Sequence, residues 1–327
     1  MKEVFRWGII GPGRIAKKFA DTVAGMPDNV VEAVASRSQQ DIRALKEVMH
    51  TDKVYSSYEE IADDENIDAV YIATPHRYHF DNGMICLKRG KPILVEKAFT
   101  VNAPQAEQLI NLAGEKNLFV MEAMWTRFFP ILKTVRGWIE AGKIGNVELV
   151  QSTLGFVAEW DPDDRLLNPE LAGGTVLDLG VYNLAMSQFI FPDYPQAINA
   201  VGCIGETGVD TAISVQLDYG GGHLSHFFST FMTKPLTQVE IYGSQGHIII
   251  QPDFYQTESV TLESGDDVET VTEPHALGGF EYEIAEAQRC IRAGLKESPL
   301  MNHQNTLHVM RMADEIRSQI GMRYSWE

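Results

Sequence analysis

The spacing of the hydrophobic positions changes near residue 122, and this change predicts two domains. Before it, short apolar runs alternate with amphipathic stretches of helical period. Strands alternating with helices in this way are typical of a parallel sheet covered on both faces. Residues 5–26 and residues 53–64 are each expected to form a strand followed by a helix. Further strands are expected in residues 30–36, 68–75, 92–97 and 118–124. Further helices are expected in residues 39–49, 78–90 and 102–117.

After residue 147 the pattern changes to shorter apolar runs separated by glycine-rich turns. The runs lie in residues 147–157, 197–205, 212–231, 238–252 and 259–264. Turns such as "YGGGH" and "GSQGH" join several of them, which indicates a large, mostly antiparallel open sheet. Two helices are expected in residues 280–295 and 304–321. The predicted fold class is α/β, with one domain over residues 1–122 and a second over residues 123–327.

The first glycines of the chain form a phosphate-binding pattern. "GIIGPGRIA" places Gly11, Gly13 and Ala16 in the spacing GxGxxA, between an expected strand and an expected helix. Gly11 permits a tight turn, Gly13 lets the backbone approach a pyrophosphate, and Ala16 allows close packing of helix on strand. Arg14 and Ile15 begin that helix, whose N-terminus attracts an anion. The pattern predicts a Rossmann domain, a doubly wound parallel sheet that binds a dinucleotide; a purely structural turn is the alternative.

The end of the second expected strand bears on the choice of nucleotide. An NAD site usually carries an acidic side chain there for the ribose hydroxyls. Here the strand ends in Ser36, Arg37 and Ser38, and Glu32 comes too early in the strand. A carboxylate would repel a 2′-phosphate, whereas an arginine flanked by hydroxyls would bind it. We therefore expect NADP as the cofactor; NAD and a solvated Arg37 without a ligand are the alternatives.

A further feature is the charged end of a buried strand. Residues 93–95 are Ile-Leu-Val, and Glu96 and Lys97 follow them directly. Ligands of parallel sheets bind beyond the carboxyl ends of the strands. Lys97 lies at such an end, and Thr74 and Trp125 lie at the ends of two other strands. We expect these side chains at the nucleotide site; a lysine that merely ends its strand in solvent is the alternative.

Composition narrows the class of protein. The formal net charge of −18 argues against nucleic acid as a partner, because phosphates require a basic face. No apolar run approaches the roughly 20 residues of a membrane helix, and the first residues do not resemble a signal peptide. Three widely spaced cysteines indicate free thiols in a reducing cytoplasm. The histidines and cysteines show no metal-ligand spacing, so no metal is expected.

Six motifs together resemble the Gfo/Idh/MocA oxidoreductases, over nearly the whole chain. They are "GIIGPGRIA", "IATPHRYH", "EKAFTVNA", "MEAMWTRFFP", "NPELAGGTVLDLGVYN" and "GSQGHI". Within the family, "MEAMWTRFFP", "LDLGVY" and "ETGVDTAISVQL" are most similar to the dimeric dihydrodiol dehydrogenases and NADP-dependent D-xylose dehydrogenases. The resemblance implies a Rossmann domain and then an α/β domain that binds a small substrate. It also implies a homodimer formed through the second sheet.

The sequence departs from the family pattern at two positions. The family usually reads Glu-Lys-Pro, often with a cis peptide bond, where this chain has Ala98 after Lys97. Many members also carry a histidine where this chain has Tyr182. The dihydrodiol-type members share this tyrosine, which is taken as their acid/base, so the second departure selects a subgroup.

The resemblance implies a hydride-transfer site. Oxidising an alcohol requires a base for the hydroxyl proton and stabilisation of charge on the oxygen. The resemblance places Lys97 beside Tyr182, and a nearby ammonium favours the phenolate that would act as the base. Asp178 precedes Tyr182 by about one helical turn and is expected to reach the substrate or to orient Lys97. A packed Tyr182 with a satisfied hydroxyl and an Asp178 that caps a helix are the alternatives.

Further residues are assigned to the cofactor. Glu96 is expected at a cofactor ribose or in a local pair, and His79 at the nicotinamide ribose or at the surface. Trp125 and Arg127 are expected to wall the nicotinamide pocket, with core packing as the alternative for Trp125. The resemblance also implies that Arg165 approaches the cofactor. Two more residues of these motifs, Thr74 and His76, are assigned to the same site.

The sequence therefore predicts a dehydrogenase or reductase that uses NADP on a hydroxyl group of a sugar, a polyol or a cyclic diol. Two alternatives stay open. One is a dinucleotide-binding regulator without catalysis, which the combination of Lys97, Asp178 and Tyr182 disfavours. The other is a glycoside hydrolase of the same family with tightly held NAD, which Arg37 disfavours.

Overall fold

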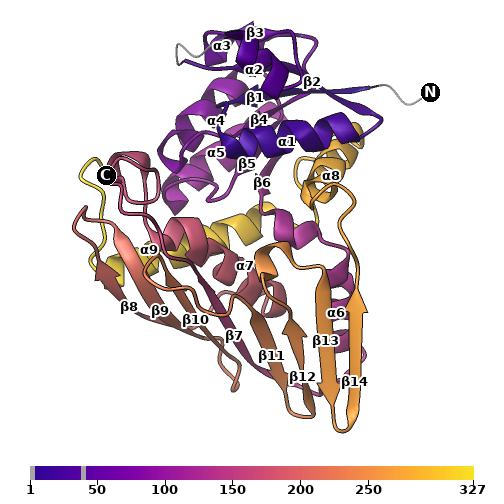
Figure 1. The fold of residues 1–327 in the computed structure, drawn as a ribbon, viewed down its shortest axis with the longest axis vertical. Coiled ribbons are helices and arrows are strands. Elements are labelled where there is room, and N and C mark those ends of the chain that lie inside the picture. Colours follow the sequence, from indigo (N-terminus) through magenta and orange to yellow (C-terminus); the bar gives the residue numbers. More distant parts are fainter. Residues whose placement is uncertain (1–3, 38–41) are drawn as a thin grey trace. The chain divides into compact units, whose positions relative to one another are not determined.

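The computed structural model describes residues 4–37 and 42–327, and the chain divides into two compact units (Figure 1). The first unit contains the chain up to Trp125 and, in addition, Ala276–Leu307. The remaining residues form the second unit. The sequence pattern predicts a single domain for residues 123–327. Residues 276–307 return to the first unit because they carry a helix that packs on the first helix of the chain.

A six-stranded parallel sheet forms the centre of the first unit. Its strands follow the order β3-β2-β1-β4-β5-β6, and every neighbouring pair is parallel. The strands are β1 (Phe5–Ile10), β2 (Asn29–Ala35), β3 (Val54–Tyr55), β4 (Ala69–Ile72), β5 (Ile93–Glu96) and β6 (Val120–Ala123). The last three are buried at every position, as expected for a sheet covered on both faces. The predicted doubly wound parallel sheet is confirmed.

Two helices of the first unit, α3 and α5, begin at a side-chain cap. Ser57 and Glu60 form a capping box at the start of α3, and Asn102 accepts a hydrogen bond from the Gln105 amide at the start of α5. The helices are α1 (Arg14–Gly25), α2 (Ile42–Val48), α3 (Tyr58–Asp63), α4 (His79–Lys88), α5 (Ala103–Lys116) and α8 (Phe280–Arg292), with a 3₁₀ turn η1 (His76–Tyr78) before α4. These elements place the loops after the strands at one edge of the sheet, where ligands of such folds bind.

An eight-stranded sheet forms the centre of the second unit. Its order is β14-β13-β12-β11-β7-β10-β9-β8, and only β7 and β10 pair in parallel among its described neighbours. The strands are β7 (Val147–Gly155), β8 (Ala197–Ile204), β9 (Asp210–Asp218), β10 (Leu224–Thr230), β11 (Val239–Gly243), β12 (Gly246–Ile250), β13 (Ser259–Ser264) and β14 (Asp267–Thr272). The predicted large, mostly antiparallel sheet is confirmed.

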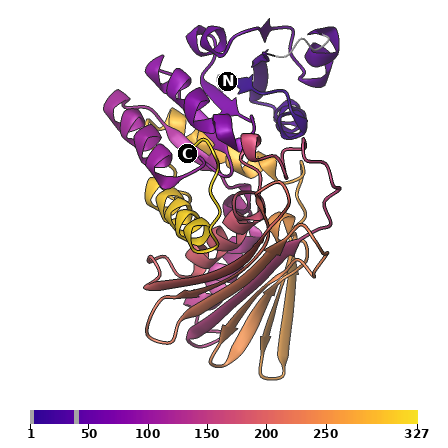
Figure 2. The same ribbon diagram turned by 90° about the vertical axis from the view of Figure 1, so that its left-hand side faces the viewer.

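Helices of the second unit lie on one side of this sheet (Figure 2). Contacts join α6 (Ile131–Glu140) to β13 and α7 (Val181–Ile190) to β7. A π-helical turn, η4 (Val176–Gly180), leads directly into α7, and α9 (His303–Gln319) crosses the division between the units. The sequence pattern did not predict α6 or β14. Strand β14 is exposed at nearly every position, so it lacks the apolar alternation on which a strand prediction depends.

A helix that crosses a bilayer needs roughly 20 consecutive apolar residues. Within residues 4–37 and 42–327, no helix is both long enough and apolar enough to span a membrane.

Candidate active site

The phosphate loop has the backbone geometry that its glycines predict. Gly11 has φ +90°, and a Cβ added there would lie 2.9 Å from Thr74 Cγ2 and 3.0 Å from the carbonyl of Ala73. A side chain at this position is therefore excluded by both conformation and space. At Gly13, the N-cap of α1, an added Cβ would meet only the Ala73 oxygen, at 3.9 Å. The loop thus leaves open space in front of a helix N-terminus, which suits a pyrophosphate.

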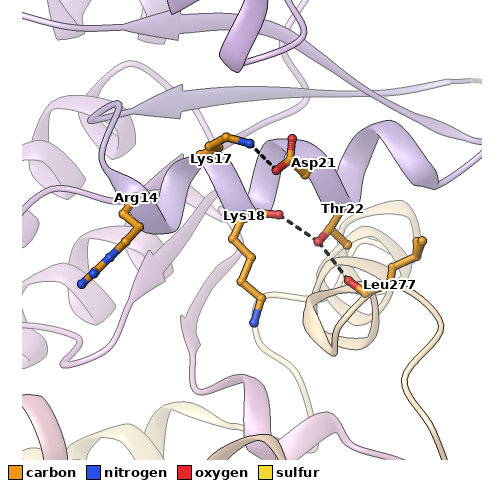
Figure 3. A pocket seen from close by; sticks show the side chains of 6 residues that line it. All are labelled: Arg14, Lys17, Lys18, Asp21, Thr22 and Leu277. Atoms are coloured by element: carbon orange, nitrogen blue, oxygen red, sulfur yellow. Dashed lines mark hydrogen bonds and ion pairs between the residues drawn. The ribbon is translucent and has the colours of Figure 1, made fainter.

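Basic side chains follow this loop along α1 (Figure 3). A cavity of about 270 Å³ is lined by Arg14, Lys17, Lys18, Asp21, Thr22 and Leu277. Lys17 is paired with Asp21 at 2.7 Å, and the Thr22 hydroxyl donates to the Lys18 carbonyl at 2.9 Å. Arg14 lies in the first turn of the helix, next to Gly13, and Ile15 is exposed beside it.

The end of β2 presents an arginine supported by two aromatic rings. Ser36 is buried, whereas Arg37 is exposed. The guanidinium carbon of Arg37 lies 4.8 Å from the ring centroid of Tyr58 and 5.4 Å from that of Tyr78. The residues at the end of this strand, from Ala35 to Arg37, include no acidic side chain. Ser38, the third residue assigned to this site from sequence, lies outside the described residues.

Lys97 follows β5 directly, at the carboxyl edge of the parallel sheet. Its neighbour Glu96 is buried and accepts a short hydrogen bond from the Tyr71 hydroxyl. The second carboxylate oxygen of Glu96 accepts from the Lys97 amide at 3.2 Å. Glu96 is therefore held in local contacts, one of the two roles expected from sequence. The Lys97–Ala98 peptide bond is cis, although the family's proline is absent.

His79 lies inside the first unit and not at its surface. Its side chain has no exposed area, and its two ring nitrogens lie 2.8 Å from the Ala98 carbonyl and 2.7 Å from the Thr74 carbonyl. Burial lowers the pKa of His79, whereas the two carbonyl oxygens oppose that change. This burial contradicts the surface alternative for His79, and its contact with a nicotinamide ribose stays a prediction. His76 is also buried, with its ring 5.8 Å from that of His79.

Trp125 packs against a charged side chain. The Lys18 ammonium lies 4.0 Å from the Trp125 ring centroid and 4.5 Å from that of Phe280. The two rings are 4.9 Å apart, and Trp125 is nearly fully buried. Burial lowers the pKa of Lys18, and the carboxylates of Glu283 and Glu96 counteract this. Within the first unit, these contacts favour core packing as the role of Trp125.

A buried acid near Glu96 was not predicted from the sequence. Glu283 has no exposed area, and neither of its carboxylate oxygens has a hydrogen-bond partner among the described residues. Burial raises the pKa of Glu283 well above its ordinary range; the nearby Glu96 adds to the rise and Lys18 opposes it. A signal was present: Glu283 stands between Phe280 and Ile284 on the apolar stripe of α8.

In the second unit, two of the predicted site residues pair with each other. Arg165 donates to Asp178 at 2.8 Å, and the Asp178 side chain is almost fully buried. Asp178 lies in the π-helical turn η4, and Tyr182 follows in the first turn of α7. The Tyr182 ring is 6.0 Å from the ring of Tyr255 and retains slight exposure. The sequence assigned Arg165 to the cofactor and Asp178 to the substrate or Lys97, and did not foresee their ion pair.

A second carboxylate fixes the start of this turn. Asp210, buried at the start of β9, accepts hydrogen bonds from the Thr175 hydroxyl at 2.6 Å and from the Val176 amide at 2.7 Å. It thereby caps the segment that carries Asp178 and Tyr182. In the sequence, the stretch around Asp210 contributes only to the family resemblance.

Arg127 is an anchor for α7 inside the second unit. It is buried and donates to the Ala185 carbonyl at 2.9 Å, while its guanidinium lies 5.2 Å from the Phe189 ring centroid. These contacts hold its side chain against the helix, and the expectation that Arg127 walls a nicotinamide pocket stays a prediction.

Comparison with known proteins identifies the family. Residues 5–124 match the Gfo/Idh/MocA oxidoreductase family with its NAD-binding Rossmann fold, and residues 132–249 match the Gfo/Idh/MocA C-terminal domain. A trans-1,2-dihydrobenzene-1,2-diol dehydrogenase from Xenopus laevis is 34% identical over 98% of this chain and 99% of its own. The chain belongs to the Gfo/Idh/MocA family and is an NAD(P)-dependent oxidoreductase, which confirms the resemblance.

Two solved structures share the fold over nearly the full length. An aldose-aldose oxidoreductase from Caulobacter crescentus, complexed with glycerol, has a TM-score of 0.88 at 21% identity, over 98% of both chains. A 3-ketoreductase from Actinomadura kijaniata, complexed with NADP and TDP-benzene, has a TM-score of 0.86 at 22% identity, over 97% of this chain and 98% of that one. At these identities the likeness extends to the fold alone.

Proposed function

We propose that this protein is an NADP-preferring dehydrogenase or reductase that acts on a CH–OH group of a sugar, a polyol or a trans-dihydrodiol. The observation that carries the proposal is Lys97, which ends a buried strand at the same edge of the sheet as the phosphate loop. Such an edge is where nucleotide and substrate meet in folds of this kind. The substrate class is supported by the dihydrodiol dehydrogenase that is 34% identical over the full chain.

The residues of the first unit fit a dinucleotide. A Cβ on Gly11 would strike Thr74 and Ala73, so the turn requires glycine there. Together with Gly13, this turn leaves room for a pyrophosphate at the N-terminus of α1. Arg37 follows β2 and lies against Tyr58 and Tyr78, and in this proposal its guanidinium would bind an adenosine 2′-phosphate. When bound, NADP supplies the carbon that accepts or donates the hydride.

Tyr182 is the proposed acid/base and Lys97 its electrostatic partner. In the direction of oxidation, the Tyr182 phenolate takes the proton of the substrate hydroxyl as the hydride leaves the carbinol carbon. The Lys97 ammonium stabilises negative charge on the phenolate and on the substrate oxygen. Asp178 is held by Arg165, so its role in the proposal is to fix the turn before Tyr182 and to contribute charge to the site. The dihydrodiol-type motif around Tyr182 supports this assignment.

Cofactor preference is tested by fluorescence titration with NADPH and NADH. We expect tighter binding of NADPH, and we expect Arg37→Ala to weaken NADPH by about tenfold to a hundredfold, since a charged hydrogen bond contributes about 1.5–3 kcal/mol. Binding of NADH should not change. Arg6→Ala is the matched control, because Arg6 lies in β1 and pairs with Glu32 away from the strand's carboxyl end. Equal affinity of the wild type for both nucleotides would contradict the preference.

A substrate screen separates the dehydrogenase from its two alternatives. Pentoses, hexoses, inositols and trans-dihydrodiols are offered with NADP, and reduced nicotinamide is followed by absorbance. Turnover of one of them supports the proposal. Nucleotide binding without turnover of any of them would favour the regulator, and release of a glycoside's leaving group with bound NAD would favour the hydrolase.

We also propose a homodimer through the eight-stranded sheet. Leu149, Phe228, Tyr242 and Ile249 are half-buried and alternate with fully buried core residues on four strands, so they point away from the helices. A mixed apolar and polar sheet face of this kind is suited to a second copy of the chain.

The dimer is tested by light scattering after gel filtration. The wild type should have the mass of two chains, and Phe228→Asp should shift it to one, because the new carboxylate would be buried without a partner. Leu295→Asp, at an exposed position of the first unit, is the control and should remain dimeric. A monomeric wild type at micromolar concentration would refute the dimer.

A cytoplasmic location completes the proposal. Its support is chemical: Cys86, Cys203 and Cys290 are free thiols, and free thiols suit a reducing compartment.

A further inference from the structure

Two tyrosines that follow strands β3 and β4 lie against the guanidinium of Arg37, which follows β2. Arg37 follows β2, Tyr58 is the first residue of α3 after β3, and Tyr78 closes η1 after β4. The Arg37 guanidinium carbon is 4.8 Å from the Tyr58 ring centroid and 5.4 Å from the Tyr78 ring centroid. Because all strands of this sheet are parallel, the three loops belong to the same edge.

The two rings hold the arginine in different ways. Tyr58 is buried, and its position is fixed by the capping box of Ser57 and Glu60 at the start of α3. Tyr78 is half-buried, in the short turn that precedes α4. A flexible arginine loses rotamer freedom when it binds a phosphate, and stacking on a fixed ring removes part of that loss beforehand. Stacking also engages the face of the guanidinium and leaves its in-plane N–H groups directed outward, the geometry that phosphate oxygens require.

We propose that Tyr58 and Tyr78 form an aromatic clamp that positions Arg37 for the 2′-phosphate of NADP, and that Tyr78 is thereby a specificity-determining residue. The inference rests on the proposed NADP preference and goes beyond it. It assigns part of the discrimination between NADPH and NADH to two rings that carry no charge. Arg37 is the group that binds, and the tyrosines are positioning residues that act through it.

The clamp is tested by measuring dissociation constants for NADPH and NADH by fluorescence titration. Tyr78→Leu should weaken NADPH by about two- to fivefold, the equivalent of a cation–π contact of about 0.5–1 kcal/mol at an exposed site, and should leave NADH unchanged. Tyr78→Phe is the matched control and should bind both nucleotides as the wild type does, because the ring remains. Tyr78→Met, which removes the ring but keeps much of the volume, should behave as Tyr78→Leu. Melting temperatures establish that each variant is folded.

A double-mutant cycle tests whether Tyr78 affects NADPH binding through Arg37. In an Arg37→Ala background, Tyr78→Leu should no longer change the ratio of the two dissociation constants, because the group that it positions is gone. Equal weakening of NADPH and NADH would overturn the clamp and indicate that the ring contacts the nucleotide directly. An unchanged ratio in Tyr78→Leu, with the preference lost in Arg37→Ala, would also overturn the clamp but leave the NADP preference intact. Equal affinities in the wild type would instead remove the preference on which the clamp rests.

Discussion

Replacing Tyr182 by phenylalanine is expected to lower kcat at least a hundredfold while NADPH still binds with its normal affinity. General acid–base catalysis by a positioned side chain contributes about 10²- to 10⁴-fold, and phenylalanine keeps the ring but cannot exchange a proton. The nucleotide contacts proposed for the phosphate loop and Arg37 lie in the first unit and do not involve this hydroxyl. Steady-state kinetics with the substrate found in the screen, together with NADPH titration, measure both effects.

A neighbouring tyrosine provides the control for this experiment. Tyr255 has its ring 6.0 Å from that of Tyr182, and Tyr255→Phe should retain most of the activity. Lys97→Met should also lose turnover, because the charge that stabilises the phenolate and the substrate oxygen is removed. Tyr182→Phe with unchanged kcat would refute the acid/base role. A large loss in Tyr255→Phe alone would move that role to the second tyrosine.

Replacing Glu283 by glutamine is expected to stabilise the protein at neutral and alkaline pH. The wild-type carboxyl is enclosed between α8, α1 and β5, where the charged groups near it are Lys18 and Glu96. Burial raises the pKa of Glu283 above its unfolded value, so the unfolded chain releases this proton at lower pH than the folded protein does. Raising the pH above the ordinary pKa of a glutamate, about 4.3, therefore favours unfolding, until the folded-state pKa is passed.

Thermal unfolding between pH 4 and pH 8 measures this effect. Wild type and Glu283→Gln should melt at similar temperatures near pH 4, where the wild-type side chain is mostly protonated in both states. At pH 8 the variant should melt several degrees higher, since 1 kcal/mol shifts the Tm of a domain of this size by about 2–4 °C. Glu115→Gln, at an exposed position of α5, is the control and should follow the wild type. Parallel curves for wild type and Glu283→Gln would show that Lys18 neutralises the buried charge completely.

Backbone-determined parts of the site could be predicted from the sequence. The glycine spacing between an expected strand and an expected helix predicts Gly11, because only glycine tolerates the positive φ and the close contact with Thr74 that the turn requires. Lys97 was identified because two charges directly after an apolar strand mark the carboxyl edge of a parallel sheet. In both cases local sequence and local geometry are tightly coupled.

Side-chain partners could not be predicted, since they depend on contacts between distant segments. His79 and Arg127 have the residue types of cofactor ligands, but backbone carbonyls of neighbouring loops and helices engage them. The pairing of Arg165 with Asp178 joins a loop to a π-helical turn, and neither residue type specifies the other as its partner. Glu283 was overlooked because a charged residue on an apolar stripe is ordinarily taken as an interruption of the stripe.

Residues 276–307 belong to the first unit although they follow the eight-stranded sheet in the sequence, and this order affects how the chain folds during synthesis. During synthesis the strands β1 to β6 leave the ribosome early, but α8, which packs on α1, follows only after the entire eight-stranded sheet. Domains generally fold in order from the N-terminus as they emerge. Here the N-terminal unit remains without its last helix until most of the second unit has been translated. The two units therefore complete their folding together, near the end of translation.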